Sequence, residues 1–542
     1  MTASTWLKDF TELAQGGDGP AIANAFVLDG FWRDYLPFGG TLQTLEGRDA
    51  IARFGAAKGP SAGLSAVEFE GDDKASEGFF RFQTHEGAGR GYIRMDGVLC
   101  HNLFTMQEGL SNAAPTPQSD EPFVLVVGGG QGGLALGAQL QDLGVPYLIV
   151  DKYPRVGDQW RSRYKNLVLH DPVWYDHLPF KPFPADWPVF TPKDQMADWL
   201  EVYAKDLGLQ IWTDTTLDSA SYDDKTSAWT AQVTRNGDTQ TLRPTHLVMA
   251  LGLSGFAKVP KFEGQDVFAG QQYHSSEFTG GEALAGRNVV IVGANNSAHD
   301  IATDLVGHGA KPVMIQRSST LVVNQADYCE RILGPLYSAE AVAKGITADK
   351  ADILQASLPL RLFEPAQRRL WDKLRANQAS FYQQLTDAGF NIDFAEDGTG
   401  LGAKYRRTAS GYYIDVGAAQ MVIDGRIAIR SGHGIARLSE TTVHLESGEA
   451  LSADAVIYAT GYGDMTDWVA KLIDVKTAEK VGLCWGYGSG TKGDPGPWIG
   501  EQRNMWVETA QPGLWLTGGN LSQARYFSRL LALQLAKRYR EK

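Results

Sequence analysis

One apolar run followed by three spaced glycines constrains the fold of this 542-residue chain more than any other feature. Residues 123–127 are continuously apolar, as expected of a buried parallel strand. Gly128, Gly130 and Gly133 follow with the spacing G-x-G-x-x-G and open an apolar helical repeat, and the next apolar run ends at Asp151. The pattern predicts a strand–loop–helix–strand unit that binds a dinucleotide.

Each part of this unit has a chemical purpose. The first glycine permits the tight turn, and the second lets backbone amides reach a pyrophosphate at a helix N-terminus. The third allows the helix to pack closely on the strand, and Asp151 is placed to accept a hydrogen bond from a ribose hydroxyl. The alternative, a glycine-rich structural turn, does not account for the strand, the helix and the acid together.

A second unit of the same kind begins with the apolar run 288–292. Its loop contains Gly293, but Asn295 and Ala298 stand where the first loop has glycine. Asparagine tolerates left-handed backbone geometry and alanine is small, so we expect the loop to keep its shape. The cofactor-binding residues predicted here are Gly293, Asn295, Asn296 and Ser297.

The residue in the acid position separates the two sites. Asp151 and Gln316 each lie 23 residues after the first glycine of their loop, so a neutral residue replaces the acid in the second unit. Arg317 and Ser318 follow Gln316, and they are suited to a 2′-phosphate that a carboxylate would repel. We expect FAD or NAD at the first loop and NADPH at the second; the alternative is that Arg317 is merely solvated.

Composition excludes several classes of function. The formal net charge of −13 argues against a nucleic-acid or anionic-membrane surface, and we expect neither partner. The three cysteines, Cys100, Cys329 and Cys484, are far apart in sequence, so no redox dithiol or metal site is predicted. No signal peptide or membrane-spanning run stands out, which predicts a soluble, cytoplasmic protein. Flavin and nicotinamide without a dithiol favour electron flow from NADPH to flavin and on to oxygen or another acceptor.

The chain divides into five predicted segments. Residues 1–110 form an α+β unit with a hairpin at Asp96-Gly97, and residues 111–121 form a linker. The first and last parts of an FAD-binding domain, 122–265 and 452–542, enclose an NADPH-binding domain at 266–451 that carries a helical insertion near 325–390. The predicted fold class is therefore α/β, with two doubly wound, Rossmann-like domains after the α+β unit.

The N-terminal unit resembles the nuclear-transport-factor-2-like (SnoaL-like) family at residues 31–34 and 46–51. That resemblance implies a curled sheet and helices forming a cone, which can hold a ligand or an active site. We favour a packing or dimerisation role, and a homodimer is left open.

Four further motifs resemble those of flavin-containing monooxygenases, and with the first loop they cover roughly residues 121–542. They are the fingerprint residues Phe268, Gly270, His274, Ser275 and Phe278, the stretch 458–462 with Gly461, the stretch 250–252 with Gly252, and the loop Gly157-Asp158-Gln159-Trp160. The segment 169–184 is most similar to the YUCCA-type branch, and the leading cone is similar to type II enzymes. Asp158, Leu251 and Thr279 depart from the family pattern.

The resemblance implies an FAD- and NADPH-dependent monooxygenase acting on a small organic substrate and O2 through a C4a-(hydro)peroxyflavin. The reaction would be N- or S-oxygenation or keto-acid oxidation. A Baeyer–Villiger monooxygenase is the alternative within enzymes, and a flavin-binding redox sensor whose N-terminal unit binds a protein is the alternative outside them.

The resemblance also assigns site residues. His170 lies where many members have an asparagine touching flavin and NADP+, so it is the candidate catalytic residue, with a structural loop histidine as the alternative. The residues expected at the cofactor edges are Gly157, Gln159, Trp160, Gly252, Gly461, Gly519 and Asn520. His274 and Ser275 are expected to hold the domain junction and the nicotinamide nucleotide, and His299 and Asp300 to be structural. Arg525, Tyr526 and Ser528 either line the substrate pocket or anchor their helix.

Overall fold

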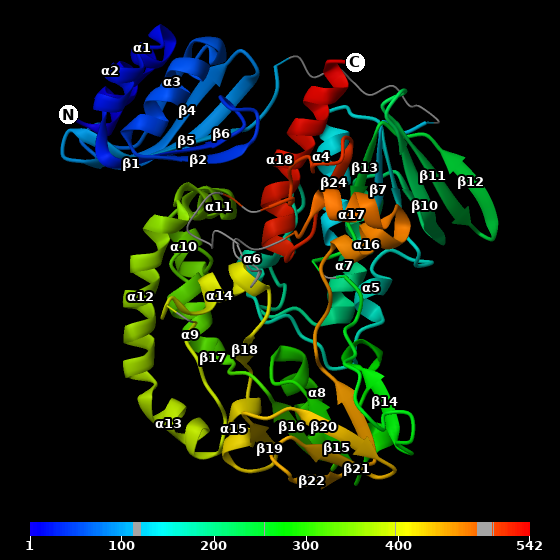
Figure 1. Cartoon of the computed structure of the whole chain (residues 1–542). Coiled ribbons are helices and arrows are strands. Elements are labelled where there is room, and N and C mark those ends of the chain that lie inside the picture. Colours follow the sequence, from blue (N-terminus) through cyan, green and yellow to red (C-terminus); the bar gives the residue numbers. More distant parts are fainter. Residues whose placement is uncertain (112–120, 254, 396, 485–500, 502) are drawn as a thin grey trace.

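The computed structural model describes residues 1–111, 121–253, 255–395, 397–484, 501 and 503–542 (Figure 1). An N-terminal unit, residues 1–111, lies against a larger body that contains two parallel sheets and a group of helices. The predicted linker falls outside the described residues except for its two ends, Ser111 and Glu121.

The N-terminal unit is a mixed six-stranded sheet with helices on one face (Figure 1). Its helices are α1 (Ala3–Gly16), α2 (Gly19–Asn24) and α3 (Arg48–Ala62), and its strands, in the spatial order β2-β1-β6-β5-β4-β3, are β1 (Phe26–Tyr35), β2 (Leu42–Glu46), β3 (Ser65–Glu70), β4 (Glu77–Thr84), β5 (Gly87–Asp96) and β6 (Leu99–Gln107). The hairpin predicted at Asp96-Gly97 joins β5 and β6, and Gly97 has the φ of 61° that such a turn requires. Trp6, Phe10 and Trp32 fill the space between helices and sheet, leaving a cavity there of only about 10 Å³.

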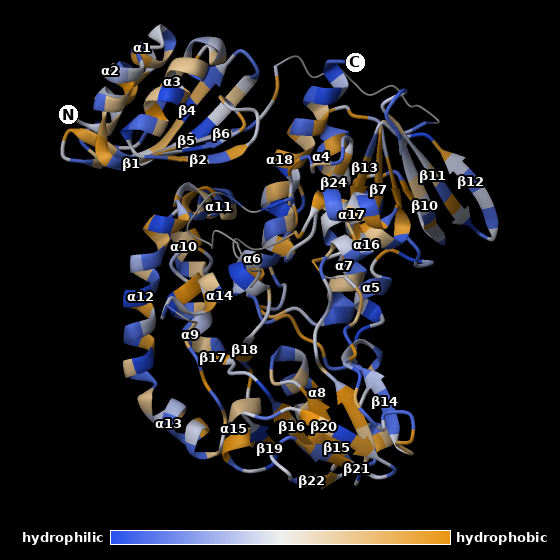
Figure 2. Cartoon of the chain, viewed as in Figure 1, coloured by the Kyte–Doolittle hydropathy of each residue, from blue (hydrophilic) through white to orange (hydrophobic). Residues whose placement is uncertain are grey.

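The first parallel sheet has the strand order β24-β13-β7-β8-β9. Its strands are β7 (Val124–Val127), β8 (Tyr147–Val150), β9 (Ile211–Trp212), β13 (His246–Met249) and β24 (Leu514–Leu516). The helices packed with it include α4 (Gln131–Asp142), α7 (Lys193–Asp206) and α18 (Leu521–Arg540). A small antiparallel sheet of β10 (Thr215–Asp223), β11 (Ala228–Arg235) and β12 (Asp238–Leu242) is inserted before β13. The predicted apolar strands are confirmed, and Figure 2 shows their hydrophobic character.

The second parallel sheet repeats this arrangement, with the order β14-β23-β15-β16-β19. Its strands are β14 (Gln271–His274), β15 (Asn288–Val292), β16 (Lys311–Gln316), β19 (Ala428–Ser431) and β23 (Ala455–Tyr458), with α8 (Asn296–Gly307) after β15 and α15 (Ala418–Ile423) before β19. An antiparallel sheet of β20 (Ile435–Ser439), β21 (Thr442–Leu445) and β22 (Ala450–Ser452) precedes β23. Because β23 pairs with β14 and β15, the chain returns to the first domain after residue 458, whereas the sequence placed that return at 452.

The helical insertion is present at the predicted place and continues beyond residue 390. It comprises α9 (Gln325–Asp327), η3 (Tyr328–Leu333), α10 (Ala339–Ala343), α11 (Ala348–Ser357), α12 (Leu360–Asn377), α13 (Ala379–Asp387) and α14 (Gly400–Thr408). The strands β17 (Leu321–Asn324) and β18 (Tyr412–Asp415), which pair in parallel, connect the insertion to the second domain.

The N-terminal unit is packed firmly on the body. Tyr35, Tyr92 and Phe104 from its sheet form one buried cluster with Ile353 of α11 and Leu530 of α18. The face of the sheet that its own helices leave uncovered therefore meets both the insertion and the first domain (Figure 1).

Candidate active site

The first glycine loop has the geometry that a pyrophosphate site needs. Gly128 has a φ of 111°, and a Cβ there would lie 2.4 Å from the carbonyl oxygen of Ala250. A Cβ on Gly133 would lie 1.9 Å from the carbonyl oxygen of Gly128, so only glycine lets α4 begin this close to the strand. Gly130 is the residue immediately before α4, so the first amides of the helix open onto the loop.

The second loop is built in the same way. Gly293 has a φ of 127°, and a Cβ there would lie 2.3 Å from the carbonyl oxygen of Ala459, just as Gly128 meets Ala250. Asn295 precedes α8 with φ −102° and ψ −170°, close to the backbone of Gly130. The expected left-handed geometry of Asn295 is therefore wrong: this position is extended, and a side chain is tolerated because the backbone is ordinary.

The acid positions of the two loops differ in what they bind. Asp151 is buried and accepts hydrogen bonds from the amides of Gly129 and Tyr153, and its burial raises the pKa of the carboxyl group. The amide of Gln316 is used internally, because it donates to the carbonyl of Asn391 at 2.8 Å and accepts from the amide of Asn391 at 2.7 Å. Arg317 and Ser318 are exposed beside it.

The loop at residues 157–160 shows where a flavin would fit. Gly157 has a φ of 91° and begins the short helix α5 (Asp158–Arg161), with no room for a Cβ against the carbonyl of Ala197. The Gln159 Nε2 and the Trp160 Nε1 are buried and have no hydrogen-bond partner within the protein. Buried orphan donors next to a pyrophosphate-type loop are what a bound flavin nucleotide would satisfy, so these residues fit FAD.

Two further predicted positions lie at the junction of the domains. The His274 Nε2 is 3.0 Å from the carbonyl oxygen of Gly461, and its Nδ1 is 2.9 Å from the Ser276 hydroxyl. Burial lowers the pKa of His274, which keeps the ring neutral in this role. Ser275 is buried in the following short helix, η1 (Ser275–Glu277). His274 thus holds β14 to the turn after β23.

The glycine turns that follow strands β13 and β24 lie together. A Cβ on Gly518 would meet the backbone of Gly252 at 3.0 Å, and the Gln131 side chain of α4 donates to the carbonyl of Gly519 at 3.2 Å. Asn520 caps α18 through its hydrogen bond from the amide of Gln523. These turns therefore surround the N-terminus of α4.

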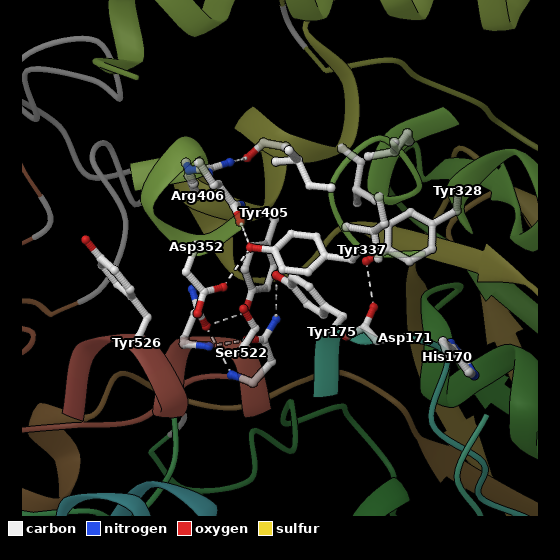
Figure 3. A pocket seen from close by; sticks show the side chains of 18 of the residues that line it. His170, Asp171, Tyr175, Tyr328, Tyr337, Asp352, Tyr405, Arg406, Ser522 and Tyr526 are labelled. Atoms are coloured by element: carbon white, nitrogen blue, oxygen red, sulfur yellow. Dashed lines mark hydrogen bonds between the residues drawn. The ribbon is translucent and has the colours of Figure 1, made fainter. Parts of the chain in front are cut away.

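A cavity of about 710 Å³ lies where all parts of the chain meet (Figure 3). Five predicted site residues line it: Trp160, His170, Asn296, Ser297 and Asn520. Trp160 and Asn520 come from the first domain, and Asn296 and Ser297 from the first turn of α8 in the second. The other residues predicted to bind the cofactors lie outside this lining, around the two loops and the junction.

His170 lies on the cavity wall beside α8. Its Nε2 is 3.9 Å from the Asp300 Oδ1, and Asp300 accepts a hydrogen bond from the Tyr164 hydroxyl. Burial raises the pKa of Asp300. Asp300, for which the sequence predicted a structural role, lines the cavity, whereas His299 is buried and stacks on Tyr413 at 3.8 Å.

Other lining residues were not predicted to be site residues. Asp171, next to His170, accepts a 2.6 Å hydrogen bond from the Tyr328 hydroxyl, and burial raises its pKa (Figure 3). The insertion also contributes Tyr337, Tyr405 and Tyr412. Only their tertiary placement identifies them, although the clustering of tyrosines at 405 and 412–413 is visible in the sequence.

The start of α18 divides between the two roles left open for it. Tyr526 lines the cavity. Arg525 is buried in a bidentate pair with Asp352 of α11 and also donates to the carbonyls of Tyr175 and His177, and Ser528 is buried outside the lining. Arg525 and Ser528 therefore anchor the helix.

Two parallel sheets of matching topology, each with a dinucleotide-type loop, define a two-domain nucleotide-binding fold of the kind found in flavin-dependent oxidoreductases. The family model described as pyridine nucleotide-disulphide oxidoreductase matches residues 125–345. The chain is 28% identical over 362 residues to the indole-3-pyruvate monooxygenase YUCCA1 of Oryza sativa subsp. japonica, covering 66% of this chain and 82% of that protein.

Two solved structures are similar in fold. Cyclohexanone monooxygenase bound to epsilon-caprolactone has a TM-score of 0.55 at 17% identity, covering 78% of this chain and 88% of that one. The complex of OTEMO with FAD and NADP has a TM-score of 0.54 at 15% identity, covering 78% and 86%. Among the residues that the model describes, no helix has the length and apolar character needed to cross a membrane.

Proposed function

We propose that this protein is an FAD- and NADPH-dependent monooxygenase that transfers one oxygen atom from O2 to a small organic substrate. One observation carries the proposal: the first turn of α8 and the flavin-side residues Trp160 and Asn520 line the same cavity. A nicotinamide bound at the second loop and a flavin bound at the first would therefore meet beside one substrate-sized space.

The residues around the first loop would hold FAD. Asp151 lies beside the loop, where it would accept a hydrogen bond from a ribose hydroxyl. The amides at the start of α4 would bind the pyrophosphate. The buried side-chain N–H groups of Gln159 and Trp160 would donate hydrogen bonds to the flavin nucleotide. Arg317 and Ser318 would bind the 2′-phosphate of NADPH, and His274 would keep the domain junction in place. When bound, the flavin accepts hydride from NADPH and activates O2.

The protein's own residues would position the substrate, exclude water from the cavity and hold or transfer protons there. His170 and Asp300 face the cavity 3.9 Å apart, and they are the groups best placed to hold a proton beside the flavin side of the cavity. A disulfide reductase is disfavoured because Cys100, Cys329 and Cys484 form no pair.

The similarity to YUCCA1 favours oxidation of a keto acid, and the cyclohexanone monooxygenase fold keeps Baeyer–Villiger oxidation of ketones as the second candidate. We also propose that residues 1–111 are an NTF2-like domain with a packing role, since their interior is filled and their free face is buried on the body.

The test uses the purified flavin-loaded protein with NADPH and ¹⁸O2. Substrate-stimulated NADPH oxidation that places one ¹⁸O atom in a product from a panel of amines, sulfides, ketones and aryl keto acids supports the proposal. NADPH oxidation that yields only hydrogen peroxide with every compound contradicts it and favours the redox-sensor alternative.

A further inference from the structure

One wall of the cavity comes from the N-terminal unit. Arg33 and Tyr35 of β1, Glu77 of β4, and Tyr92 and Arg94 of β5 all line the space that His170 and Asn520 line from the other domains. The sheet for which the sequence predicted a packing or dimerisation role thus also lines this cavity.

The unit is held rigidly enough to act as a wall. The Arg33 guanidinium donates to the carbonyls of Ala356 and Leu358 at 2.6 and 2.7 Å, and it forms a bidentate pair with Glu501. The Asn102 side chain donates to the carbonyl of Ser357 at 2.9 Å. Because these bonds hold the turn between α11 and α12, they also position Ala356 and Leu358, which line the same cavity.

Arg94 differs from Arg33 in how its charge is balanced. Arg33 and Glu501 are both nearly buried, with side-chain exposures of 6% and 11%. Among the residues that the structure describes, the carboxylate paired with Arg94 is that of Glu77, at 3.6 Å, and it is 57% exposed, so water screens the pair. The Arg94 Nη1 donates to the Ser357 hydroxyl at 2.9 Å and the guanidinium lies 4.5 Å from the Tyr92 ring, which fixes its direction.

A guanidinium in this state is a ready partner for an anion. Burial lowers the pKa of Arg94, and the half-exposed Glu77 carboxylate at 3.6 Å offsets that cost only in part. An arginine guanidinium remains charged at neutral pH. A ligand carboxylate at the cavity wall would supply the charge-assisted hydrogen bonds that Glu77, 3.6 Å away, is too distant to make.

We propose that the N-terminal sheet is the specificity wall of the substrate cavity, and that Arg94 selects substrates carrying a carboxylate. This inference rests on the proposed monooxygenase function and names the group that reads the substrate. Arg94 acts by binding, so its loss changes substrate affinity and leaves the reaction of NADPH with the flavin intact.

The experiment compares phenylpyruvate with phenylacetone, two aryl ketones that differ by the carboxylate. Arg94→Gln should raise the KM and the dissociation constant of phenylpyruvate about tenfold while changing those of phenylacetone by less than twofold. Arg94→Lys should recover part of the loss. The control Arg81→Gln removes an arginine of the same sheet that pairs with Glu70 outside the cavity and should change neither compound.

A second variant keeps the test valid if Arg94→Gln fails to fold. Glu77→Gln removes the exposed carboxylate that competes for Arg94. It should lower the dissociation constant of phenylpyruvate two- to threefold, whereas Arg94→Gln should raise it. Dissociation constants are measured by quenching of protein fluorescence, which needs no turnover.

The two proposals fail separately. If phenylpyruvate binds in a way that depends on Arg94 but no oxygenated product forms, the proposed monooxygenase function is refuted and the proposed role of Arg94 in binding carboxylates stands. The proposed role of Arg94 is overturned if the protein oxygenates its substrate but Arg94→Gln changes the KM and dissociation constants of both compounds equally. It is also overturned if phenylpyruvate does not bind to the wild-type protein.

Discussion

At the scale of single residues, the two nucleotide loops differ in how much side chain they tolerate. Gly133 and Ala298 hold equivalent places at the start of α4 and α8. Gly133 lies directly against the backbone of Gly128, and Ala298 is fully buried. Asn295 replaces a glycine without strain because its backbone is extended. In the first loop, Gly128 and Gly133 leave no room for a side chain, whereas in the second loop this is true of Gly293 but not of Asn295 or Ala298.

We predict that Gly133→Ala will weaken FAD retention at least tenfold, because the new methyl group would lie 1.9 Å from the carbonyl of Gly128. The ratio of visible flavin absorbance to protein absorbance in the purified protein measures this. Gly132→Ala is the matched control, since a Cβ there meets nothing within 4 Å. Equal flavin content in the two variants would refute the assignment of this loop to FAD.

We predict that Arg317→Ala will raise the KM for NADPH about tenfold and the KM for NADH by less than twofold, because only NADPH carries the 2′-phosphate. Steady-state kinetics with both nucleotides provides the measurement. Arg287→Ala removes another exposed arginine of the same domain, one that pairs with Asp454, and should affect neither KM. An equal rise for both nucleotides would mean that Arg317 is only solvated.

At the scale of elements, α11 and α18 are joined by a buried ion pair. Arg525 and Asp352 have side-chain exposures of 7% and 6%, and Arg525 also satisfies two backbone carbonyls near α6 (Val173–Asp176). The pair connects the insertion, the last helix and the loop that carries His170.

Arg525→Ala should lower the free energy of unfolding by about 3–5 kcal/mol, because it leaves the Asp352 carboxylate buried without its partner. Urea unfolding followed by circular dichroism tests this. The double variant Arg525→Met with Asp352→Leu should lose clearly less, since it leaves no unpaired charge. If both proteins lose the same stability, the ion pair is not what joins these helices.

At the scale of the whole molecule, the N-terminal unit and the body share a buried apolar interface. Ile353 of α11 is 1% exposed and packs in one cluster with Tyr35, Tyr92 and Phe104 of the N-terminal sheet. Such an interface couples the unfolding of the two parts.

Ile353→Ala should cost about 2–4 kcal/mol and should shift two signals together: fluorescence, to which Trp6 and Trp32 of the N-terminal unit contribute, and release of the flavin. Thermal unfolding recorded with both probes tests the coupling. Val342→Ala, at a position 49% exposed on α10, should shift neither signal. A fluorescence shift without earlier flavin release would show that the N-terminal unit unfolds independently.

The local features of this protein follow from its sequence. The strands 124–127, 147–150 and 288–292, the helices after them and the positive φ of Gly128 and Gly293 are set by apolar runs and by the steric freedom of glycine. Both act over a few residues, so both nucleotide loops and the contrast between Asp151 and Gln316 can be found without a structure.

The sequence predicted Trp160, His170, Asn296, Ser297 and Asn520 as site residues, but only the tertiary structure brought them together with the rest of the cavity wall. Tyr92, Arg94 and Tyr328 belong to no motif, Asp171 was not singled out within the segment 169–184, and Asp300 had been assigned a structural role. Tyr92 and Arg94 reach the cavity because α11 and α18 pack on the free face of the N-terminal sheet. Asp300 reaches it beside His170, and Tyr328 through its hydrogen bond to Asp171. Such packing depends on the shape and burial of whole elements, and no local spacing records it.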